Sequence, residues 1–309
     1  MNDVKVLVTG GAGYLGWSVI SALADMSGIA EIVIYDNFMR QNYGLLLKSR
    51  QEMRKKCIVR VDDILNSRGL EKALEGAECI CHLAALAPSP YSDDHPHAFD
   101  QVNHWGTAEV AYAAERAKVK RFVYVSSGAI YGFGRDFFTP QSSPMPVSAY
   151  GASKLAGENQ VRRLSDKMEV VIIRAGTLFG LNPVARFDTF VNKFVLNMSL
   201  GMPIQIHGSG DQRRPLVHVD QLARLVVAGV IGELEPDIYN AVHQNKSVNE
   251  VVEIARTILP KLNTIFINQQ QRMRDIVMQP DSRFRSFMDK NETVEEALGA
   301  MLSQIAMRI

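Results

Sequence analysis

Short apolar runs rich in β-branched residues alternate with helical stretches through the first half of the chain. Six runs have the length and composition of buried strands: Val4–Thr9, Glu31–Tyr35, Cys57–Val61, Glu78–Leu83, Arg121–Ser126 and Val170–Arg174. Three segments between them have apolar residues at helical spacing: Tyr14–Asp25, Asn103–Lys118 and Ala149–Lys167. Apolar strands separated by helices form parallel sheets that are covered on both faces. The sequence therefore predicts an α/β fold with a doubly wound parallel sheet.

The second half mixes shorter strands with helices. We expect strands at Ile204–His207, Leu216–Val219, Asp237–Ala241 and Thr264–Ile267, and helices at Val184–Leu200, Gln221–Val230, Val248–Leu259 and Thr293–Ala306. These pieces predict a smaller mixed α/β lobe. The expected division places residues 1–173 in the domain of the parallel sheet and residues 174–309 mainly in the lobe, with the two parts interwoven.

The composition is that of a globular chain. Of the 309 residues, 47% are hydrophobic and 22% are charged, and the formal net charge is +1. This near neutrality lacks the electrostatic footprint of a nucleic-acid binder, so we expect no such partner. The basic run at residues 48–56 is interpreted as a solvated helix face or loop edge. The longest apolar stretches, such as Leu225–Ile231, fall far short of the ~20 residues that cross a bilayer, so we expect no membrane partner.

The cysteines and histidines indicate the compartment and the absence of a metal. Cys57, Cys79 and Cys81 are an odd number without zinc-like spacing, and the first residues show no secretory signal. We interpret the three cysteines as reduced side chains of a cytoplasmic protein. The chain also has three histidines close together, His95, His97 and His104. Two of them flank a proline and no acidic or cysteine partner has ligand spacing, so we expect no metal site.

A glycine-rich turn follows the first strand and opens the first helix. It contains Gly10, Gly13, Tyr14, Leu15 and Gly16. Glycines there allow a tight turn and let a pyrophosphate approach the amides of the helix N-terminus, as in Rossmann folds. Asp36 lies 20 residues beyond Gly16, at the end of the second strand, where a carboxylate accepts from ribose hydroxyls and repels a 2′-phosphate. The sequence thus predicts NAD as the cofactor, with NADP kept open by the nearby Arg40.

Tyr150 and Lys154 stand four residues apart at the start of a predicted helix and can act together on one helix face. A nearby ammonium would favour the phenolate of Tyr150, which could then remove a proton from a substrate hydroxyl. Ser127 ends the fifth strand, at the sheet edge where ligands of open α/β sheets bind. This segment favours a catalytic site at Tyr150 and Lys154; a strand-end cap is one role for Ser127 itself.

At these residues the chain resembles the extended short-chain dehydrogenase/reductase family, in its NAD-dependent nucleotide-sugar epimerase/dehydratase branch. The resemblance spans nearly the whole chain and rests on motifs in the family's order, namely the glycine turn, Asp63–Ile64, His82–Ala85, Val102–Asn103 with Gly106–Thr107, Ser126–Ser127, and Tyr150 with Lys154. It implies that Ser127 is the catalytic hydroxyl, Tyr150 the acid/base and Lys154 the residue that binds the nicotinamide ribose. It also assigns Asp63, Ile64, Leu83, Ala84, Ala85 and Asn103 to the cofactor.

The second half carries the substrate side of the resemblance. Arg214 matches an arginine that contacts the nucleotide diphosphate in the family, and Arg272 a second one; a solvated surface charge is the alternative for each. Thr177 stands where the family often has Asn, so the usual substrate contact is altered. The 4,6-dehydratases of the family carry an Asp-Glu pair directly after the catalytic hydroxyl residue, whereas this chain has Gly128–Ala129.

The resemblance implies an NAD-dependent epimerase of a nucleoside-diphosphate sugar that works through a transient keto-sugar, with C4 as the expected carbon and a homodimer as the expected assembly. A dehydrogenase or keto-reductase of a nucleotide sugar or related alcohol is the first alternative. A non-catalytic dinucleotide-sensing or RNA-binding protein on the same fold is the second. The retained Ser127, Tyr150 and Lys154 favour an enzyme.

Overall fold

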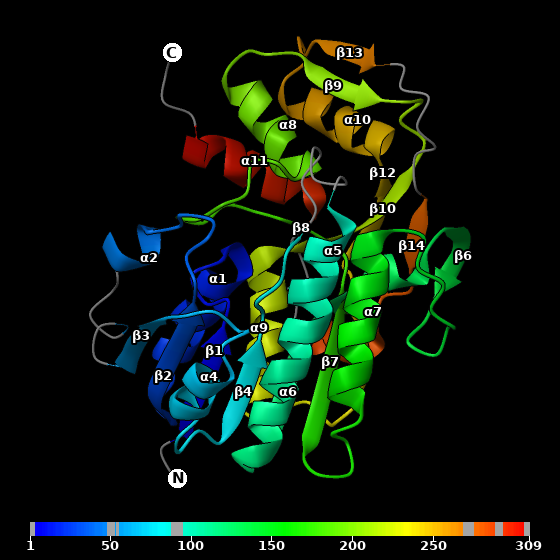
Figure 1. Ribbon diagram of the computed structural model, residues 1–309. Coiled ribbons are helices and arrows are strands. Elements are labelled where there is room, and N and C mark those ends of the chain that lie inside the picture. Colours follow the sequence, from blue (N-terminus) through cyan, green and yellow to red (C-terminus); the bar gives the residue numbers. More distant parts are fainter. Residues whose placement is uncertain are drawn as a thin grey trace.

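A seven-stranded parallel sheet forms the centre of the computed structural model, which describes residues 4–47, 53, 56–87, 95–267, 275–287 and 293–305 (Figure 1). Its strand order is β11-β7-β5-β4-β1-β2-β3. The strands are β1 (Val4–Thr9), β2 (Ile29–Asp36), β3 (Cys57–Val61), β4 (Cys79–His82), β5 (Arg121–Ser127), β7 (Glu169–Ala175) and β11 (Ile238–Ala241). The predicted α/β fold with a doubly wound parallel sheet is confirmed.

Helices cover both faces of the sheet. One face is covered by α1 (Tyr14–Ala24) and α9 (Val219–Val230). The other face is covered by α4 (Ser67–Ala73), α6 (Thr107–Arg116) and α7 (Ala149–Arg162). The period of two along a strand sorts the side chains: Val6 and Val8 pack in the α1/α9 core, and Leu7 in the opposite core. Burial on both faces explains why these strands read as continuous apolar runs.

Two later segments belong to the sheet layer instead of the smaller lobe. Strand β11 pairs in parallel with β7 at the edge of the sheet, and α9 packs beside α1. The expectation that residues 237–241 and 221–230 build the lobe is therefore wrong. A short buried strand and an apolar helix carry no local sign of the sheet they will join, because pairing is a long-range contact.

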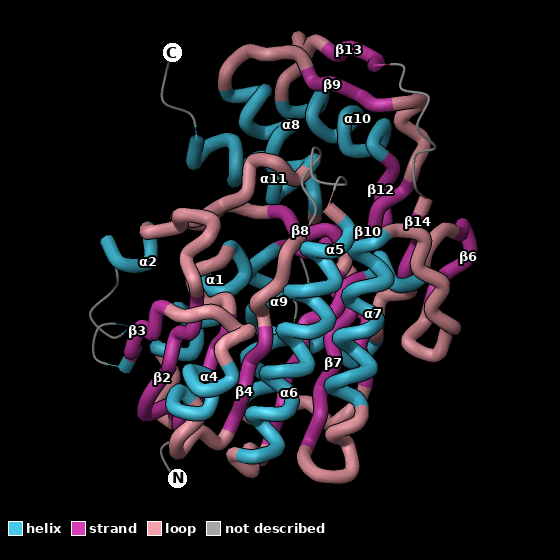
Figure 2. Tube along the Cα trace, in the orientation of Figure 1, coloured by secondary structure: helices cyan, strands magenta, loops and turns pink. Residues whose placement is uncertain are grey.

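The smaller lobe lies beyond the carboxyl ends of the strands. It contains α8 (Phe190–Ser199), β9 (Ile204–His207), α10 (Val248–Ile258) and α11 (Val294–Ile305), which share an apolar core, and β13 (Thr264–Ile267), which pairs with β9. Strand β10 (Arg213–His218) joins β8 (Thr177–Phe179) and β12 (Gln244–Ser247) in a three-stranded sheet, and β6 (Gly134–Phe138) pairs with β14 (Ile276–Met278). Figure 2 shows the loop that follows β4 running toward this lobe.

The strands β6, β8, β12 and β14 escaped prediction. Two have only three residues, and β12 has the polar sequence Gln-Asn-Lys-Ser. The short helical elements α2 (Gly44–Leu47), η2 (Gly128–Tyr131, a 3₁₀ helix) and η3 (Ser282–Phe287, also 3₁₀) also lacked a signal. Such short strands and helices are stabilised by tertiary contacts, so their own sequences do not predict them.

Two predicted helices have different beginnings. The helix expected from Asn103 is preceded by α5 (Pro96–Phe99) and a π-helix, η1 (Asp100–Gly106), before α6. The helix expected from Val184 begins at Phe190. Asn182 Oδ1 accepts from the Val184 amide, and the Arg186 side chain pairs with Asp188. These two contacts hold the segment before Phe190 as a turn. Apolar spacing does not reveal either feature.

Some predicted features fall outside the described ranges. Arg272 lies there, and of the basic run at residues 48–56 only Met53 and Lys56 are described. Within the described ranges no helix is long and apolar enough to pass through a membrane. The three cysteines are unpaired, and burial raises the pKa of the Cys57 thiol to about 11 and that of Cys79 to about 12.

Candidate active site

A cavity of about 960 Å³ lies between the carboxyl edge of the large sheet and the smaller lobe. Sixteen of the predicted site residues line it: Gly10, Gly13, Tyr14, Leu15, Gly16, Asp36, Asp63, Ile64, Leu83, Ala84, Ala85, Ser127, Tyr150, Lys154, Thr177 and Arg214. Residues in or shortly after β1, β2, β3, β4 and β5 therefore meet residues of α7, β8 and β10 around one space. The parallel topology causes this, because parallel strands present all their carboxyl ends at one edge.

The glycine turn between β1 and α1 forms one wall of the cavity. Gly10 has a φ of +70°, and a Cβ there would lie 2.5 Å from the Ala84 amide nitrogen. A Cβ at Gly16 would lie 2.5 Å from the Gly10 carbonyl oxygen. Helix α1 begins directly after Gly13, which has no side chain to cap it. The amides of its first turn can therefore bind a phosphate, and a larger residue would close the approach.

Asp36 closes the end of this wall. Its Oδ2 accepts from the Ala12 amide at 3.0 Å and its Oδ1 from the Phe38 amide at 2.8 Å. Burial raises the pKa of the carboxyl group, and these two amides act in the opposite direction. Each oxygen keeps a lone pair for a ribose hydroxyl. Arg40, the residue that kept NADP open, also lines the cavity and donates to the Ala87 carbonyl oxygen at 3.1 Å.

A buried chain of hydrogen bonds joins β1, β4 and α6 below the cavity. His82 Nδ1 lies 2.6 Å from Thr9 Oγ1, and His82 Nε2 lies 2.9 Å from Thr107 Oγ1. Because Thr107 donates its proton to the Asn103 carbonyl oxygen, His82 Nε2 must carry the ring proton and Nδ1 must accept from Thr9. Burial lowers the pKa of His82 to about 3, so the ring is neutral.

Asn103 supports the cavity without lining it. The side chain is fully buried; it accepts from the Leu86 amide at 2.8 Å and donates to the Leu86 carbonyl oxygen at 2.9 Å and to Ser153 Oγ at 3.0 Å. Leu86 in turn lines the cavity. The structure thus places Asn103 behind the loop that follows β4, where its side-chain amide donates to two protein partners.

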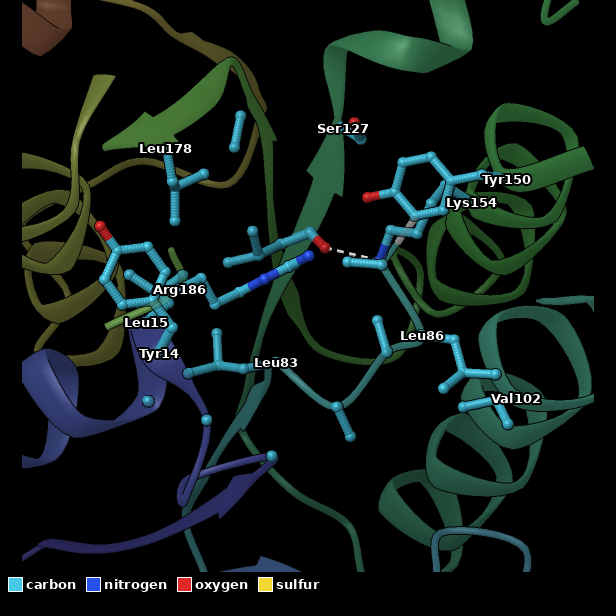
Figure 3. A pocket seen from close by; sticks show the side chains of 18 of the residues that line it. Tyr14, Leu15, Leu83, Leu86, Val102, Ser127, Tyr150, Lys154, Leu178 and Arg186 are labelled. Atoms are coloured by element: carbon cyan, nitrogen blue, oxygen red, sulfur yellow. Dashed lines mark hydrogen bonds between the residues drawn. The ribbon is translucent and has the colours of Figure 1, made fainter. Parts of the chain in front are cut away.

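Lys154 lies inside the cavity wall, one turn along α7 from Tyr150 (Figure 3). Its Nζ donates to the Val125 carbonyl oxygen at 2.7 Å and lies 4.3 Å from the centroid of the Tyr124 ring. Burial lowers the pKa of Lys154 to about 7, although the carboxylate of Glu158 acts to raise it. The ammonium is therefore poised near neutrality, and a small change in its surroundings changes its charge.

Tyr150 is held by α7, which begins after the cap residue Ser148. Figure 3 shows the Tyr150 hydroxyl pointing into the cavity, on the side of Ser127 and Lys154. Its ring packs edge-on against Phe99 at 5.8 Å. Burial raises the pKa of the phenol, while the Ser127 hydroxyl and the Arg186 guanidinium act to lower it. A partly buried phenol beside a hydroxyl and a guanidinium is suited to exchange a proton with a bound ligand.

Ser127 caps a short helix and also lines the cavity. Its Oγ accepts from the Ala129 amide at 3.2 Å and so caps η2, and the residue lines the cavity. Gly128 follows it under Met278, whose Sδ would lie 2.4 Å from a Cβ at Gly128. The space that an acidic side chain would take at position 128 is thus filled.

Several cavity residues escaped sequence analysis. Arg186, Asp188, Phe133, Val147 and Ile276 all line the cavity. They come from loops and from the short strand β14, and only the chain's tertiary course brings them to the site. Ser126 also lines the cavity, and its Oγ is one of the few buried side-chain atoms of the described chain without a hydrogen-bond partner. Ser126 belongs to the Ser126–Ser127 motif, whereas no local pattern pointed to the other five residues.

One of the three histidines expected not to bind a metal contacts an acidic side chain. His104 Nδ1 lies 3.0 Å from Asp100 Oδ1, and the rings of His95 and His97 are 6.1 Å apart. In the part of the chain that the structure describes, no group of three or more His, Cys, Asp or Glu side chains is arranged to bind a metal ion.

Comparisons with known proteins match both the sequence and the fold. The model of the NAD dependent epimerase/dehydratase family matches residues 6–241. The dTDP-D-glucose 4,6-dehydratase of Mus musculus is 30% identical over 263 residues, which cover 82% of this chain and 72% of that protein. A probable UDP-glucuronate 4-epimerase of Rhizobium meliloti (strain 1021) is 28% identical over 256 residues, which cover 80% of this chain and 73% of that protein.

A solved structure shows the same fold. The crystal structure of UDP-glucuronic acid 4-epimerase from Bacillus cereus, in complex with UDP-glucuronic acid and NAD, is 24% identical to this chain. It superimposes with a TM-score of 0.84 and covers 98% of this chain and 99% of its own. The likeness therefore includes the smaller lobe as well as the large sheet.

Proposed function

Because the chain belongs to the NAD dependent epimerase/dehydratase family, we propose that it is an NAD-dependent epimerase of a nucleoside-diphosphate sugar, acting at C4 through a transient keto-sugar. One observation carries the proposal. Ser127, Tyr150 and Lys154 line the same cavity as the glycine turn and Asp36, while Gly128, which follows Ser127, has no side chain to act as an acid. This arrangement provides proton exchange beside a dinucleotide site and lacks the additional acid of an elimination.

The cavity fits NAD on its own geometry. Gly10 and Gly16 leave space that a Cβ would fill, and the buried Ser126 hydroxyl lacks a partner among the described protein groups. We propose that the first turn of α1 holds the pyrophosphate and that Asp36 accepts from the adenosine ribose hydroxyls. Asp63, Ile64 and residues 83–85 would enclose the adenine and the middle of the dinucleotide. When bound, NAD⁺ would accept the hydride from the sugar carbon and return it to the opposite face.

The chain's own residues move the proton and hold the substrate. Tyr150 Oη takes the proton of the sugar hydroxyl as the C–H hydride leaves, and returns a proton to the oxygen when the hydride comes back, so the reaction is balanced without a net oxidant. Ser127 holds the same oxygen by a hydrogen bond, and Lys154 favours the phenolate. Thr177 and Arg214 face the substrate. The planar guanidinium of Arg214 is suited to bind the diphosphate, so that only the sugar rotates between the two hydride transfers. Arg272 is proposed as a second diphosphate contact.

A 4,6-dehydratase is the competing activity within the family, because the mouse relative carries that name. Elimination needs an acid and a base at the neighbouring carbons, which the resemblance places at positions 128 and 129. Here these positions hold Gly128 and Ala129, and Met278 fills the space above Gly128. The epimerase therefore fits this cavity better than the dehydratase.

The experiment is a substrate panel with three distinguishable outcomes. The purified protein is analysed for bound NAD by mass spectrometry and then incubated with UDP-, GDP-, CDP- and dTDP-sugars, with products resolved by NMR. An epimerase interconverts two C4 epimers of equal mass with no net absorbance change at 340 nm. A stoichiometric change at 340 nm would assign a dehydrogenase or keto-reductase, and a product lighter by one water would assign a dehydratase.

We also propose that the enzyme is a cytoplasmic homodimer, with the substrate lobe formed mainly by residues 174–309. The surface of α6 and the preceding π-helix supports the dimer: Trp105 is 57% exposed and Tyr112 47% exposed. Large aromatic side chains left in water on one helical surface favour a partner of the same kind. Unpaired cysteines support a reducing compartment. Sedimentation of the wild type and of Trp105→Glu tests the dimer, which the charge should dissociate.

A further inference from the structure

The phenol of Tyr14 joins the glycine turn to the loop that follows β8. Tyr14 is the first residue of α1, and its hydroxyl donates to the Gly180 carbonyl oxygen at 2.6 Å. Burial raises the pKa of this phenol, so it remains a donor at neutral pH. Its oxygen also accepts from Asn192 Nδ2 at 3.2 Å. One buried hydroxyl therefore links the dinucleotide wall with α8 and with the segment between β8 and α8.

Asn192 completes the link on the side of the loop. Its Oδ1 accepts from the Gly180 amide at 3.0 Å, and its Nδ2 also donates to the Arg186 carbonyl oxygen at 2.9 Å. Thr189 Oγ1 donates to the same carbonyl at 3.2 Å. The Asn192 side chain is fully buried. Its amide thus holds both ends of the segment from Gly180 to Arg186, and the Tyr14 hydroxyl fixes that amide in turn.

A second contact ties the same loop to α1. Asn182 Nδ2 donates to the Tyr14 carbonyl oxygen at 2.8 Å and to Ser18 Oγ at 3.2 Å. Ser18 in turn donates to Asp220 at the start of α9 at 2.8 Å. Hydrogen bonds therefore tie the loop at residues 180–186 to α1 at two points. These bonds restrict the movement of the loop relative to the glycine turn.

The loop presents Arg186 to the cavity. Its Nε donates to Asp188 Oδ1 at 2.9 Å, with a second contact of 2.5 Å from Nη2 to Oδ2, so the fork is oriented by the carboxylate. Arg186 lines the cavity, and Figure 3 shows its side chain extending from the side of Tyr14 toward the centre of the space. A guanidinium in that place faces whatever is bound at the centre of the cavity.

We propose that Tyr14 and Asn192 are positioning residues for Arg186: their buried hydrogen bonds fix the loop at residues 180–186 and thereby hold the guanidinium against the bound substrate. The proposal rests on the proposed function, since it takes an anionic nucleoside-diphosphate sugar as the group that Arg186 faces. Tyr14 thus acts on the substrate half through its side chain, in addition to the cofactor role of its backbone.

The test is a double-mutant cycle between Tyr14→Phe and Arg186→Ala. Tyr14→Phe keeps the ring and removes only the hydroxyl, so the KM of the nucleotide sugar and the Kd of UDP should rise about tenfold, while the NAD content of the purified protein stays the same. In the Arg186→Ala background the same change should add less than about twofold, because the group that it positions is gone. Tyr239→Phe is the matched control: that buried hydroxyl donates to the Glu235 carbonyl oxygen, away from the cavity.

Full additivity of the two substitutions, or loss of NAD with an unchanged Kd for UDP, would overturn the proposal. Asn192→Ala provides a second variant and should reproduce the rise in the Kd for UDP. Hydrogen exchange of residues 180–190 is measured in parallel without any substrate: faster exchange in Tyr14→Phe than in Tyr239→Phe supports the positioning role, and equal exchange contradicts it. This readout separates the inference from the proposed function, because it holds or fails even if no sugar nucleotide is turned over.

Discussion

Glu158 and Arg174 form a forked ion pair that is completely buried beneath the candidate active site. Arg174 Nη2 lies 2.6 Å from Glu158 Oε1, and Nε lies 3.2 Å from Oε2. The second terminal nitrogen donates to Tyr131 Oη at 2.9 Å and to the Pro140 carbonyl oxygen at 2.8 Å. Glu158 is one turn beyond Lys154 on α7, so the pair anchors the catalytic helix to β7.

Breaking this pair from one side should be costly. Glu158→Leu leaves an uncompensated buried guanidinium, and the free energy of unfolding should fall by about 3–5 kcal/mol. The double variant Glu158→Leu/Arg174→Leu should lose less than the sum of the two single losses, because neither charge remains. Urea unfolding of the three variants and the wild type measures the coupling, and additive losses would contradict the interpretation.

Tyr150→Phe should abolish turnover while the protein stays folded. The substitution removes only the hydroxyl that exchanges the proton, so kcat should fall by about 10²–10⁴-fold. Thermal unfolding and bound NAD report whether the site is otherwise intact. Tyr112→Phe, which keeps the ring and removes a hydroxyl on α6 outside the cavity, is the control and should behave as the wild type in every one of these measurements. Undiminished turnover in Tyr150→Phe would remove this residue from the mechanism.

The neutral His82 should make the protein sensitive to acid. Its pKa is about 3 in the folded state against an ordinary value of 6.5, so the unfolded chain binds a proton between these values and the folded chain does not. Stability therefore falls as the pH falls from about 6.5 toward 3. His82→Gln, which cannot titrate, should lose about 2 kcal/mol less than the wild type between pH 6.5 and 4.5.

Urea unfolding at these two pH values checks the His82 prediction. The comparison uses the change with pH for each protein, because His82→Gln also disturbs the hydrogen bonds to Thr9 and Thr107 and shifts the absolute stability. Equal acid sensitivity of the two proteins would show that His82 is not the group responsible.

Lys154→Met should abolish turnover and raise the free energy of unfolding. Burial lowers the pKa of Lys154 to about 7, below its ordinary 10.5, so the unfolded chain binds more protons between these values and the stability that depends on Lys154 rises with pH. Removing the buried ammonium should stabilise the apoprotein at pH 6 by about 1–4 kcal/mol, and this advantage should shrink toward pH 10. Turnover should be lost at every pH. A variant that is less stable than the wild type at pH 6 would contradict the sign.

Local patterns determined the parallel sheet and the nucleus of the site. The strand near Leu7 is apolar on both faces because helices cover both, and contiguous residues record this directly. Likewise the turn at Gly10 needs a positive φ and close approach to Ala84, which only glycine allows. Tyr150 and Lys154 are neighbours on one helix turn, so their spacing alone placed them together.

Only the tertiary structure decided the rest of the cavity. Arg186 enters it because Tyr14 and Asn192, 178 residues apart, hold its loop. Asn103 donates a hydrogen bond to the Leu86 carbonyl oxygen from a π-helix. Apolar spacing does not reveal a π-helix, so this contact could not be predicted. Strand β11 joined the large sheet by pairing with β7. Spacing along the chain encodes which residues share a turn or a face, whereas these contacts depend on segments that meet only after the chain has folded.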